Sequence, residues 1–305
     1  MNLKRLKYFV KIVDIGSLTQ AAEVLYIAQP ALSQQVANLE AELDQKLLIR
    51  TKRGVTPTEA GKVLYVHAKA ILRQCEQAQI AVNSVGKALK GAVSIGLAPG
   101  AASSVVILPM LKSMRAGLPD VMIHLHENSN AVLNDKLLNG ELDMAIVYDS
   151  SAQEGLVSEP LLKENLFLVG SGSCPGKTVD LNTIAEMNLF LPCGYSALRK
   201  RIDNAFALRS LHTEVMGEIE STATLTAVVA SGMGVTILPE SAACSLVAAT
   251  HGWMAHITQP SLSLPLTLNL SSRQPLTAQS EAVKDSLLSL VSRPLPENSL
   301  WMMAG

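Results

Sequence analysis

Hydrophobic residues recur at helical spacing in two short neighbouring segments near the start of the chain. In the first segment the apolar positions are Leu18, Ala21, Ala22 and Leu25, and Ser17 stands where a side-chain oxygen can cap the first turn. In the second segment Pro30 lies near the first turn, and Ala31 or Leu32, then Val36 and Leu39, keep the helical period. This pattern predicts two short helices joined by a tight turn, which is the arrangement of a helix-turn-helix.

The second predicted helix turns polar side chains away from its apolar stripe. Gln29, Ser33, Gln34 and Gln35 occupy that outer face. A glutamine amide offers both a donor and an acceptor to a base edge, and a serine hydroxyl can bond to a base or a phosphate. The face is therefore suited to the major groove of DNA, although an ordinary solvent-facing helix pair would carry similar residues.

A basic segment follows the two helices. The apolar run 47–49 precedes Arg50, Lys52 and Arg53, and Gly54 then suits a chain reversal into a second short strand. Such a hairpin would place its cations beside the DNA backbone or in the minor groove. A solvated basic loop without a ligand is the alternative.

A long helix is predicted after the hairpin, opening at residues 58–61. Its apolar stripe comprises Leu64, Ile71, Cys75, Ala78, Val82, Val85 and Leu89. A one-sided helix of this length needs a partner, which is either the rest of the chain or a second copy of the same helix. Gly86 and Gly91 indicate where the helix ends.

From residue 92 onwards, predicted strands and helices alternate. The predicted strands are 93–97, 121–126, 144–148, 166–170, 189–191, 215–219, 235–238 and 264–270, and the predicted helices are 105–114, 132–138, 198–208, 225–230 and 281–291. This alternation is typical of an α/β fold with parallel sheets and right-handed crossovers. Periodicity alone leaves one large sheet and two smaller lobes as alternatives.

Charge is distributed unevenly along the 305 residues. The net charge is −1, but residues 1–90 carry 13 Lys and Arg against 7 Asp and Glu, a balance of +6, and the remainder carries 12 against 19, a balance of −7. A basic N-terminal part on an acidic body fits local attraction to phosphate groups. Because the N-terminal part is only moderately basic, we expect useful affinity to require two copies acting together.

Cysteine spacing and the N-terminus indicate where the protein works. The four cysteines are far apart, without a CxxC pair, which favours a reduced cytosolic interior. The N-terminus has cations spread among its apolar residues and no apolar block typical of a signal peptide. Residues 222–239 are apolar but broken by glycines, so a buried helix and strand are expected there and no membrane association.

An enzyme or a solute-binding protein is the rival class. His124 and His126 share one strand face, next to Glu127, but no third metal ligand has a recognisable spacing. The glycine-rich segment 170–176 lacks the lysine of a phosphate-binding loop, and no GxSxG motif occurs. A solute-binding protein would need an export signal and has no use for residues 1–90. We therefore expect neither catalysis nor a cofactor.

The sequence blocks 16–22 (GSLTQAA), 29–33 (QPALS) and 56–61 (TPTEAG) resemble, in this order, a LysR-type transcriptional regulator. The resemblance extends over the whole chain. Segments 6–14 and 48–55 resemble members of the family that activate and repress nitrogen-assimilation genes.

The resemblance implies a winged helix-turn-helix over residues 1–58 and a dimerising linker helix over 59–90. Residues 91–305 would form a regulatory domain of two Rossmann-like lobes, similar to a type 2 periplasmic binding protein. One lobe would comprise 92–161 plus 266–305, and the other 162–265. A homodimer or homotetramer, promoter DNA and RNA polymerase are the implied partners, in the cytoplasm and with the nucleoid.

Positions matching the family imply particular contacts. Gln29, Pro30, Ser33 and Gln34 should face the major groove, and Arg53 should face the minor groove. Ala28 departs from the family, which often has Ser or Thr there, so the hydroxyl cap of the recognition helix is missing.

The family's effector cleft maps onto Gly100, Ser129 and Ser196. The loop 98–102 has no hydroxyl before Ser103, and the two serines could simply cap helices. We therefore expect a weak or absent small-molecule requirement, with activity set by protein abundance. A LysR-type regulator of another pathway, responding to an effector in this cleft, is the alternative.

Overall fold

The computed structural model describes residues 1–51, 54–84, 89–101, 106–148 and 153–292. The chain forms two compact units. One comprises residues 1–87 with 139–141, and the other comprises 88–138 with 142–305.

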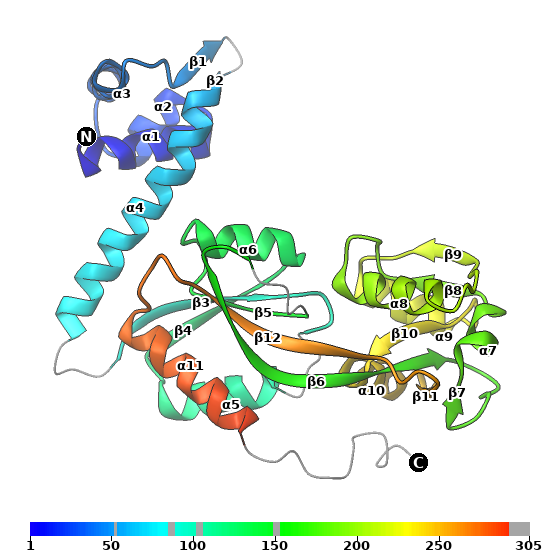
Figure 1. Ribbon diagram of the computed structural model, residues 1–305. Helices are drawn as coiled ribbons and strands as arrows, with labels where there is room; N and C mark the ends of the chain where they lie inside the picture. The colour runs from blue at the N-terminus through cyan, green and yellow to red at the C-terminus, as the bar shows by residue number, and fades with distance from the viewer. Residues whose placement is uncertain (52–53, 85–88, 102–105, 149–152, 293–305) are drawn as a thin grey trace. The chain divides into compact units, whose positions relative to one another are not determined.

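The N-terminal unit is a small helical domain with a two-stranded hairpin (Figure 1). Its elements are α1 (Leu3–Ile15), α2 (Leu18–Val24), α3 (Gln29–Leu43), β1 (Leu48–Thr51), β2 (Gly54–Pro57) and α4 (Glu59–Ser84). The Ser17 side chain accepts from Gln20 N, as predicted, and so starts α2. β1 and β2 pair antiparallel from Leu48 opposite Pro57 to Thr51 opposite Gly54, which confirms the predicted hairpin.

The core of this unit is built by the apolar stripes of the three short helices and closed by the hairpin. Phe9, Ile12, Leu32 and Leu39 are completely buried in it, together with Leu6, Leu18, Ala21, Ala22, Val36, Leu47, Leu48, Val55 and Ala68. Burying such side chains contributes roughly 1.5–3 kcal/mol each, which holds α3 against its neighbours.

The long helix α4 has 26 residues. Leu64, Ile71 and Leu72 pack against the core, whereas Val63 is 62% exposed and Val82 is 74% exposed. The described helix ends at Ser84, so Val85 of the predicted stripe lies outside the described residues, and Leu89 of that stripe is not in the helix. The helix thus combines a packed first half with exposed apolar side chains.

The C-terminal unit alternates strands and helices. Its first part comprises β3 (Gly91–Leu97), α5 (Ile107–Gly117), β4 (Val121–Glu127), α6 (Asn130–Leu138), β5 (Met144–Val147) and β6 (Leu156–Gly170). The second part comprises β7 (Thr178–Val179), α7 (Leu181–Ala185), β8 (Leu189–Leu191), α8 (Ala197–Ala207), β9 (Val215–Glu218), α9 (Thr222–Ala230), β10 (Thr236–Pro239), α10 (Glu240–Thr250), β11 (Trp253–Ile257), β12 (Ser263–Ser271) and α11 (Ala278–Val291).

The main sheet has the strand order β4-β3-β5-β12-β6-β11-β7, with β10 also paired to β6. β3 is parallel to β4 and β5, but β12 is antiparallel to both β5 and β6, and β10 and β11 are antiparallel to β6. The expectation of purely parallel sheets is therefore wrong. Periodicity predicts strands but carries no information on their direction.

β6 and β12 are long antiparallel strands that run side by side. β6 starts ten residues before the predicted strand 166–170. Its residues before 166 pair with β12, and its last five residues pair with β10 and β11. The sequence pattern also missed β7, α7, α10 and β11.

α5 and α11 lie side by side on one face, where Ser113 and Ser286 share a hydrogen bond of 3.0 Å (Figure 1).

The apolar segment 222–239 forms α9 and β10, as predicted, with Leu225, Val229 and Ile237 buried in the core. Across the described ranges, no helix is long and apolar enough to cross a membrane.

Candidate DNA-binding interface

The turn between α2 and α3 is tight and leaves its aromatic residue in solvent. Leu25 N donates to Ala21 O and Ile27 N to Ala22 O, both at 3.0 Å, so the chain reverses directly after α2. Tyr26 lies in the left-handed region at φ 53° and is 95% exposed. Ala28 precedes α3 without a side-chain cap, as the sequence predicts.

The recognition helix α3 divides cleanly into a buried and an exposed face. Leu32 and Val36 are buried, whereas Ala31 is exposed, so Leu32 carries the apolar stripe. On the outer face Gln29, Pro30 and Gln34 are exposed, and Ser33 is half-buried. The structure therefore keeps all four candidate major-groove residues out of the core.

The hairpin and the recognition helix share a hydrogen bond. Arg50 Nη1 donates to Ser33 Oγ at 2.9 Å from an exposed position on β1. The bond joins one candidate residue of the hairpin to one of the helix, although they lie 17 positions apart. Lys52 and Arg53 lie outside the described residues.

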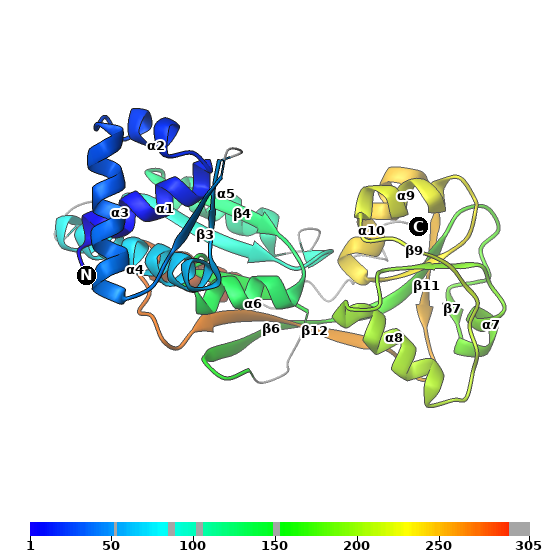
Figure 2. The same cartoon turned by 90° about the horizontal axis from the view of Figure 1, so that it is seen from above.

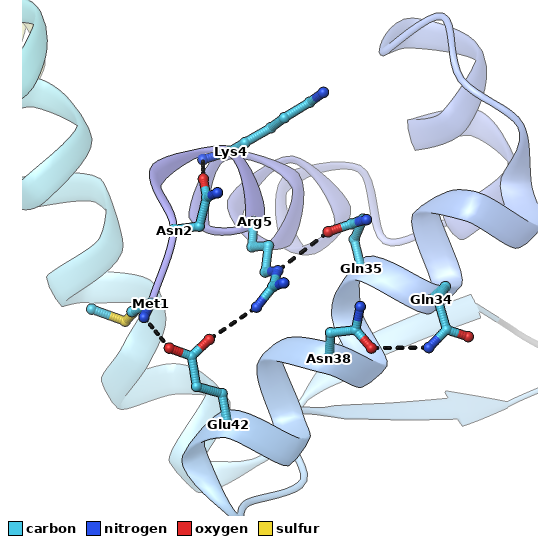
Figure 3. Close-up of polar contacts among 8 residues, drawn as sticks. All are labelled: Met1, Asn2, Lys4, Arg5, Gln34, Gln35, Asn38 and Glu42. Carbon is cyan, nitrogen blue, oxygen red and sulfur yellow. Dashed lines mark hydrogen bonds and ion pairs between the residues drawn. The ribbon is translucent and has the colours of Figure 1, made fainter.

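Two glutamines of α3 are oriented by neighbours (Figure 3). Gln34 Nε2 donates to Asn38 Oδ1 at 2.9 Å, one helical turn away. Gln35 Oε1 accepts from Arg5 Nε at 3.3 Å, and Arg5 Nη1 also donates to Glu42 Oε2 at 3.0 Å. Figure 3 shows Arg5 reaching from α1 to these two partners on α3, so the Gln35 side chain contributes to the contact between the two helices.

Sequence reasoning singled out neither Asn38 nor the pair of Arg5 and Glu42. The i,i+4 spacing of Gln34 and Asn38 is a local signal that could have found the first contact. Arg5 and Glu42 are separated by 37 positions, and only folding brings them together.

A buried carboxylate anchors the start of the hairpin. Glu40 Oε2 binds Lys46 Nζ at 2.9 Å, and its Oε1 accepts from Leu47 N at 2.9 Å and Leu48 N at 3.3 Å. Burial by itself raises the pKa of Glu40, but these hydrogen bonds outweigh it and hold the pKa below its ordinary value. The carboxylate thus fixes where β1 leaves α3.

Two glycines allow the hairpin to dock closely on its surroundings. Gly54 adopts φ +132°, and a Cβ there would lie 2.6 Å from the carbonyl oxygen of Gly16, which accepts from Val55 N at 2.8 Å. A Cβ on Gly61 in α4 would lie only 2.1 Å from Leu47 O. The hairpin is therefore held from both ends by backbone approaches that only glycine permits.

A second candidate site lies in the C-terminal unit. Gly100, Ser129 and Ser196 all line one cavity of about 190 Å³, so the structure brings the three predicted cleft residues together. Apolar residues form much of the remaining wall, including Ala98, Pro99, Leu198, Ile219, Leu225 and Leu238. Ser196 Oγ accepts from Arg199 N at 3.1 Å and caps α8, which matches the simple capping role. Ser103 lies outside the described residues.

Two tyrosines of this cavity interact with carboxylates. Tyr148 donates to the buried Glu164, which also accepts from Ser241 N at 3.0 Å. Burial, with the charge and hydrogen bond of Glu164, raises the pKa of Tyr148 well above its ordinary value. At the half-exposed Tyr195, the hydrogen bond with Glu220 is the main cause that raises the pKa to about 12.

His124 and His126 are exposed on β4. Within the described part of the chain, no group of three or more His, Cys, Asp or Glu side chains could hold a metal ion.

Comparison with known proteins places this architecture in a family. Residues 3–62 match the bacterial regulatory helix-turn-helix protein of the lysR family, and residues 86–292 match the LysR substrate binding domain. The chain belongs to the LysR family of regulatory helix-turn-helix proteins. Its members are transcriptional regulators and not enzymes, as the sequence predicts, and the predicted fold class is confirmed.

Particular relatives match nearly the whole chain. The chain is 66% identical over 298 residues to the nitrogen assimilation regulatory protein nac of Klebsiella aerogenes, which covers 98% of each chain. It is 64% identical over 303 residues to the protein of the same name from Escherichia coli K12, which covers 99% of each. Among solved structures, full-length CbnR complexed with its target DNA has a TM-score of 0.73 at 21% identity, covering 96% of this chain and 100% of CbnR.

Proposed function

We propose that this chain is a sequence-specific DNA-binding regulator that activates and represses the transcription of nitrogen-assimilation genes. The observation that carries the proposal is the polar outer face of α3, presented beside a basic hairpin. Two relatives named nitrogen assimilation regulatory proteins, at 66% and 64% identity, support the assignment of the pathway.

The proposed contacts divide between the two grooves. Gln29, Pro30, Ser33 and Gln34 face base edges in the major groove, where glutamine and serine can read donors and acceptors. The three cations of the hairpin lie along the sugar-phosphate backbone of the DNA and in the adjacent minor groove; they are Arg50, Lys52 and Arg53. The excess of six positive charges over residues 1–90 supports this orientation.

We propose that two or four copies act together on promoter DNA. The exposed Val63 and Val82 support pairing through α4. We assign residues 1–58 to the DNA-binding domain, 59–90 to the linker that contains α4, and 91–305 to the regulatory domain. Two lobes, 92–161 with 266–305 and 162–265, form the regulatory domain in this proposal. RNA polymerase is the further proposed partner, and the cytoplasmic nucleoid is the proposed place of action.

The proposed regulator has a weak or absent requirement for a small molecule in the apolar cavity. The capping role of Ser196 and the many apolar residues of the lining support this. Calorimetry with nitrogen metabolites tests it. A specific micromolar ligand that alters DNA binding would contradict it and would favour an effector-responsive regulator of another pathway.

DNA binding is tested by gel shift on promoter fragments. We expect Gln34→Ala combined with Arg53→Ala to weaken binding at least about a hundredfold, because it removes a base contact in the major groove and a cation in the minor groove. A matched control combines Gln45→Ala with Arg115→Ala, two exposed positions outside the proposed contacts. Retained binding in the Gln34→Ala, Arg53→Ala variant would overturn the assigned contacts. A separate experiment, genome-wide mapping of bound DNA under nitrogen limitation, tests the assignment of the pathway.

A further inference from the structure

Tyr26, in the turn between α2 and α3, has a side chain that the fold itself does not use. It is 95% exposed, and among the residues that the structure describes its hydroxyl and ring have no partner. The other four tyrosines of the chain each contact a charged side chain: Tyr8 contacts Lys4, Tyr65 contacts Asp14, Tyr148 contacts Glu164, and Tyr195 contacts Glu220. The phenol group of Tyr26 is thus available to a molecule outside the chain.

The backbone at Tyr26 adopts a conformation that a bulky residue rarely takes. Its φ of 53° lies in the left-handed region, where the Cβ of an L-residue crowds a neighbouring carbonyl oxygen. Glycine adopts this region without a steric penalty. Because the aromatic ring is almost wholly exposed, its packing does not offset this cost. A strained residue without a structural use indicates a functional role.

The turn that carries Tyr26 is held in place on both sides. Tyr26 N donates to Glu23 O at 3.1 Å, and Ile27 N donates to Ala22 O at 3.0 Å. The flanking side chains of Leu25 and Ile27 are partly buried and pack against the core of the N-terminal unit. The backbone of Tyr26 is therefore ordered before any partner arrives, and a contact made by its side chain costs little backbone entropy.

The turn also lies directly before the recognition helix. Figure 2 shows α2 leading through this turn into α3, which begins at Gln29, three residues after Tyr26. When the N-terminal end of a recognition helix enters the major groove, the helix before it crosses the DNA backbone. Residues 20–32 contain one hydroxyl group, that of Tyr26, and Ala28 at the start of α3 offers none. Tyr26 therefore supplies the hydroxyl donor of this segment.

We propose that the Tyr26 hydroxyl donates a hydrogen bond to a phosphate oxygen of the DNA backbone, beside the major groove that α3 enters. The phosphate oxygen is ionised, so this bond is stronger than one between neutral groups. Such a contact positions the recognition helix on the duplex and carries no sequence information. The inference rests on the proposed DNA-binding function and adds to it a contact outside both α3 and the hairpin.

Tyr26→Phe tests the proposal because it removes only the hydroxyl. Fluorescence anisotropy with promoter DNA should show about tenfold weaker binding, by the same factor for every operator variant. The salt dependence of binding should stay that of the unchanged chain, because a neutral phenol displaces no cations from DNA, whereas Arg50→Ala should reduce it. Ser210→Ala removes an exposed hydroxyl at another left-handed position, φ 54°, in the C-terminal unit, and should bind like the unchanged chain.

A second measurement tests whether the partner is a phosphate. Single phosphates of the operator are replaced, one at a time, by uncharged methylphosphonate. At one position or more, the unchanged chain and Tyr26→Phe should bind with nearly equal affinity, since the hydrogen bond is then weakened or missing in both. A difference between the two proteins that persists at every position would overturn the assignment to a phosphate.

Tyr26→Gly separates DNA binding from folding. Glycine accommodates φ 53°, so the melting temperature should not fall, although DNA binding should weaken as in Tyr26→Phe. Unchanged DNA binding in Tyr26→Phe would overturn this inference alone. Loss of transcription activation with intact DNA binding would also overturn it, because it would indicate a protein partner. If the unchanged chain shifted no promoter fragment, the regulator proposal would fail, and this contact with it.

Discussion

The guanidinium group of Arg50 is bonded to the hydroxyl group of Ser33, with 2.9 Å between Nη1 and Oγ. The hairpin cation is thus tied to the recognition helix, and the serine hydroxyl already has one partner. A guanidinium has five N–H donors, so Arg50 keeps others for DNA. Helix and hairpin therefore act as one surface at this point.

Substitutions of this pair should have coupled effects. We expect Ser33→Ala and Arg50→Ala to weaken operator binding by less in combination than the sum of their separate effects, with a coupling of about 1 kcal/mol. Fluorescence anisotropy with labelled operator DNA measures the binding free energies of the two single variants and the double variant, which form a double-mutant cycle. Ser33→Ala combined with Arg115→Ala should be additive, and additivity in the first cycle would contradict the coupling.

Asn38 should influence which DNA sequence is preferred. Its Oδ1 accepts from Gln34, so Asn38→Ala leaves the Gln34 amide free to turn. We expect a change of about fivefold in the preference between operator variants, a fraction of the discrimination that one base contact provides. Competition binding with a set of single-base operator variants measures it. Asn165→Ala, at an exposed position on β6, should leave the preference unchanged, and a uniform loss across all operators in Asn38→Ala would argue against orientation of Gln34.

Glu40 should make the hairpin sensitive to acid. Its pKa is lowered in the folded state, so its stabilising effect is present above the ordinary value of 4.5 and is lost as pH falls through the folded value. Glu40→Gln should cost about 2 kcal/mol at neutral pH, since Lys46 and two backbone N–H groups lose their charged acceptor.

Hydrogen exchange of peptides covering 44–58 measures this effect at several pH values. In the unchanged chain, protection against exchange should decrease when the pH drops below the ordinary pKa of Glu40. In the variant, protection should be low at every pH. The exposed Glu23→Gln serves as control and should behave like the unchanged chain. Equal protection in Glu40→Gln at neutral pH would refute the anchoring role.

Gly61→Ala should disrupt the junction between hairpin and α4. The added Cβ would meet Leu47 O at 2.1 Å, and a backbone atom cannot move aside cheaply. We expect a loss of about 3 kcal/mol in the N-terminal unit, seen as faster hydrogen exchange over residues 1–87 and weaker DNA binding. At Gly117 in α5 nothing lies within 4 Å of an added Cβ, so Gly117→Ala should be nearly neutral. Similar results for both alanines would exclude steric overlap as the cause.

Tyr148→Phe should destabilise the C-terminal unit. It removes the hydroxyl that donates to Oε2 of the buried Glu164, and a buried carboxylate oxygen that loses its donor costs about 2 kcal/mol. Urea unfolding followed by tryptophan fluorescence measures this, because both tryptophans belong to residues 142–305. Tyr195→Phe, at a half-exposed position, should cost much less, and an equal loss in both variants would contradict the role of burial.

The sequence by itself determined the elements that local spacing encodes. Apolar residues at helical period predict α2 and α3, Ser17 marks the start of α2, and Gly54 marks the hairpin reversal. The departure at Ala28 is also confirmed, since no side chain caps α3. These features rest on interactions within a few residues, so the pattern along the chain is sufficient to find them.

Tertiary structure alone decided the relationships between distant segments. β6 and β12 run antiparallel, Arg50 reaches Ser33, and Arg5 bridges to Glu42 because folding buries apolar faces far apart in sequence against each other. Strand direction and side-chain partners follow from that packing, which residue spacing does not encode.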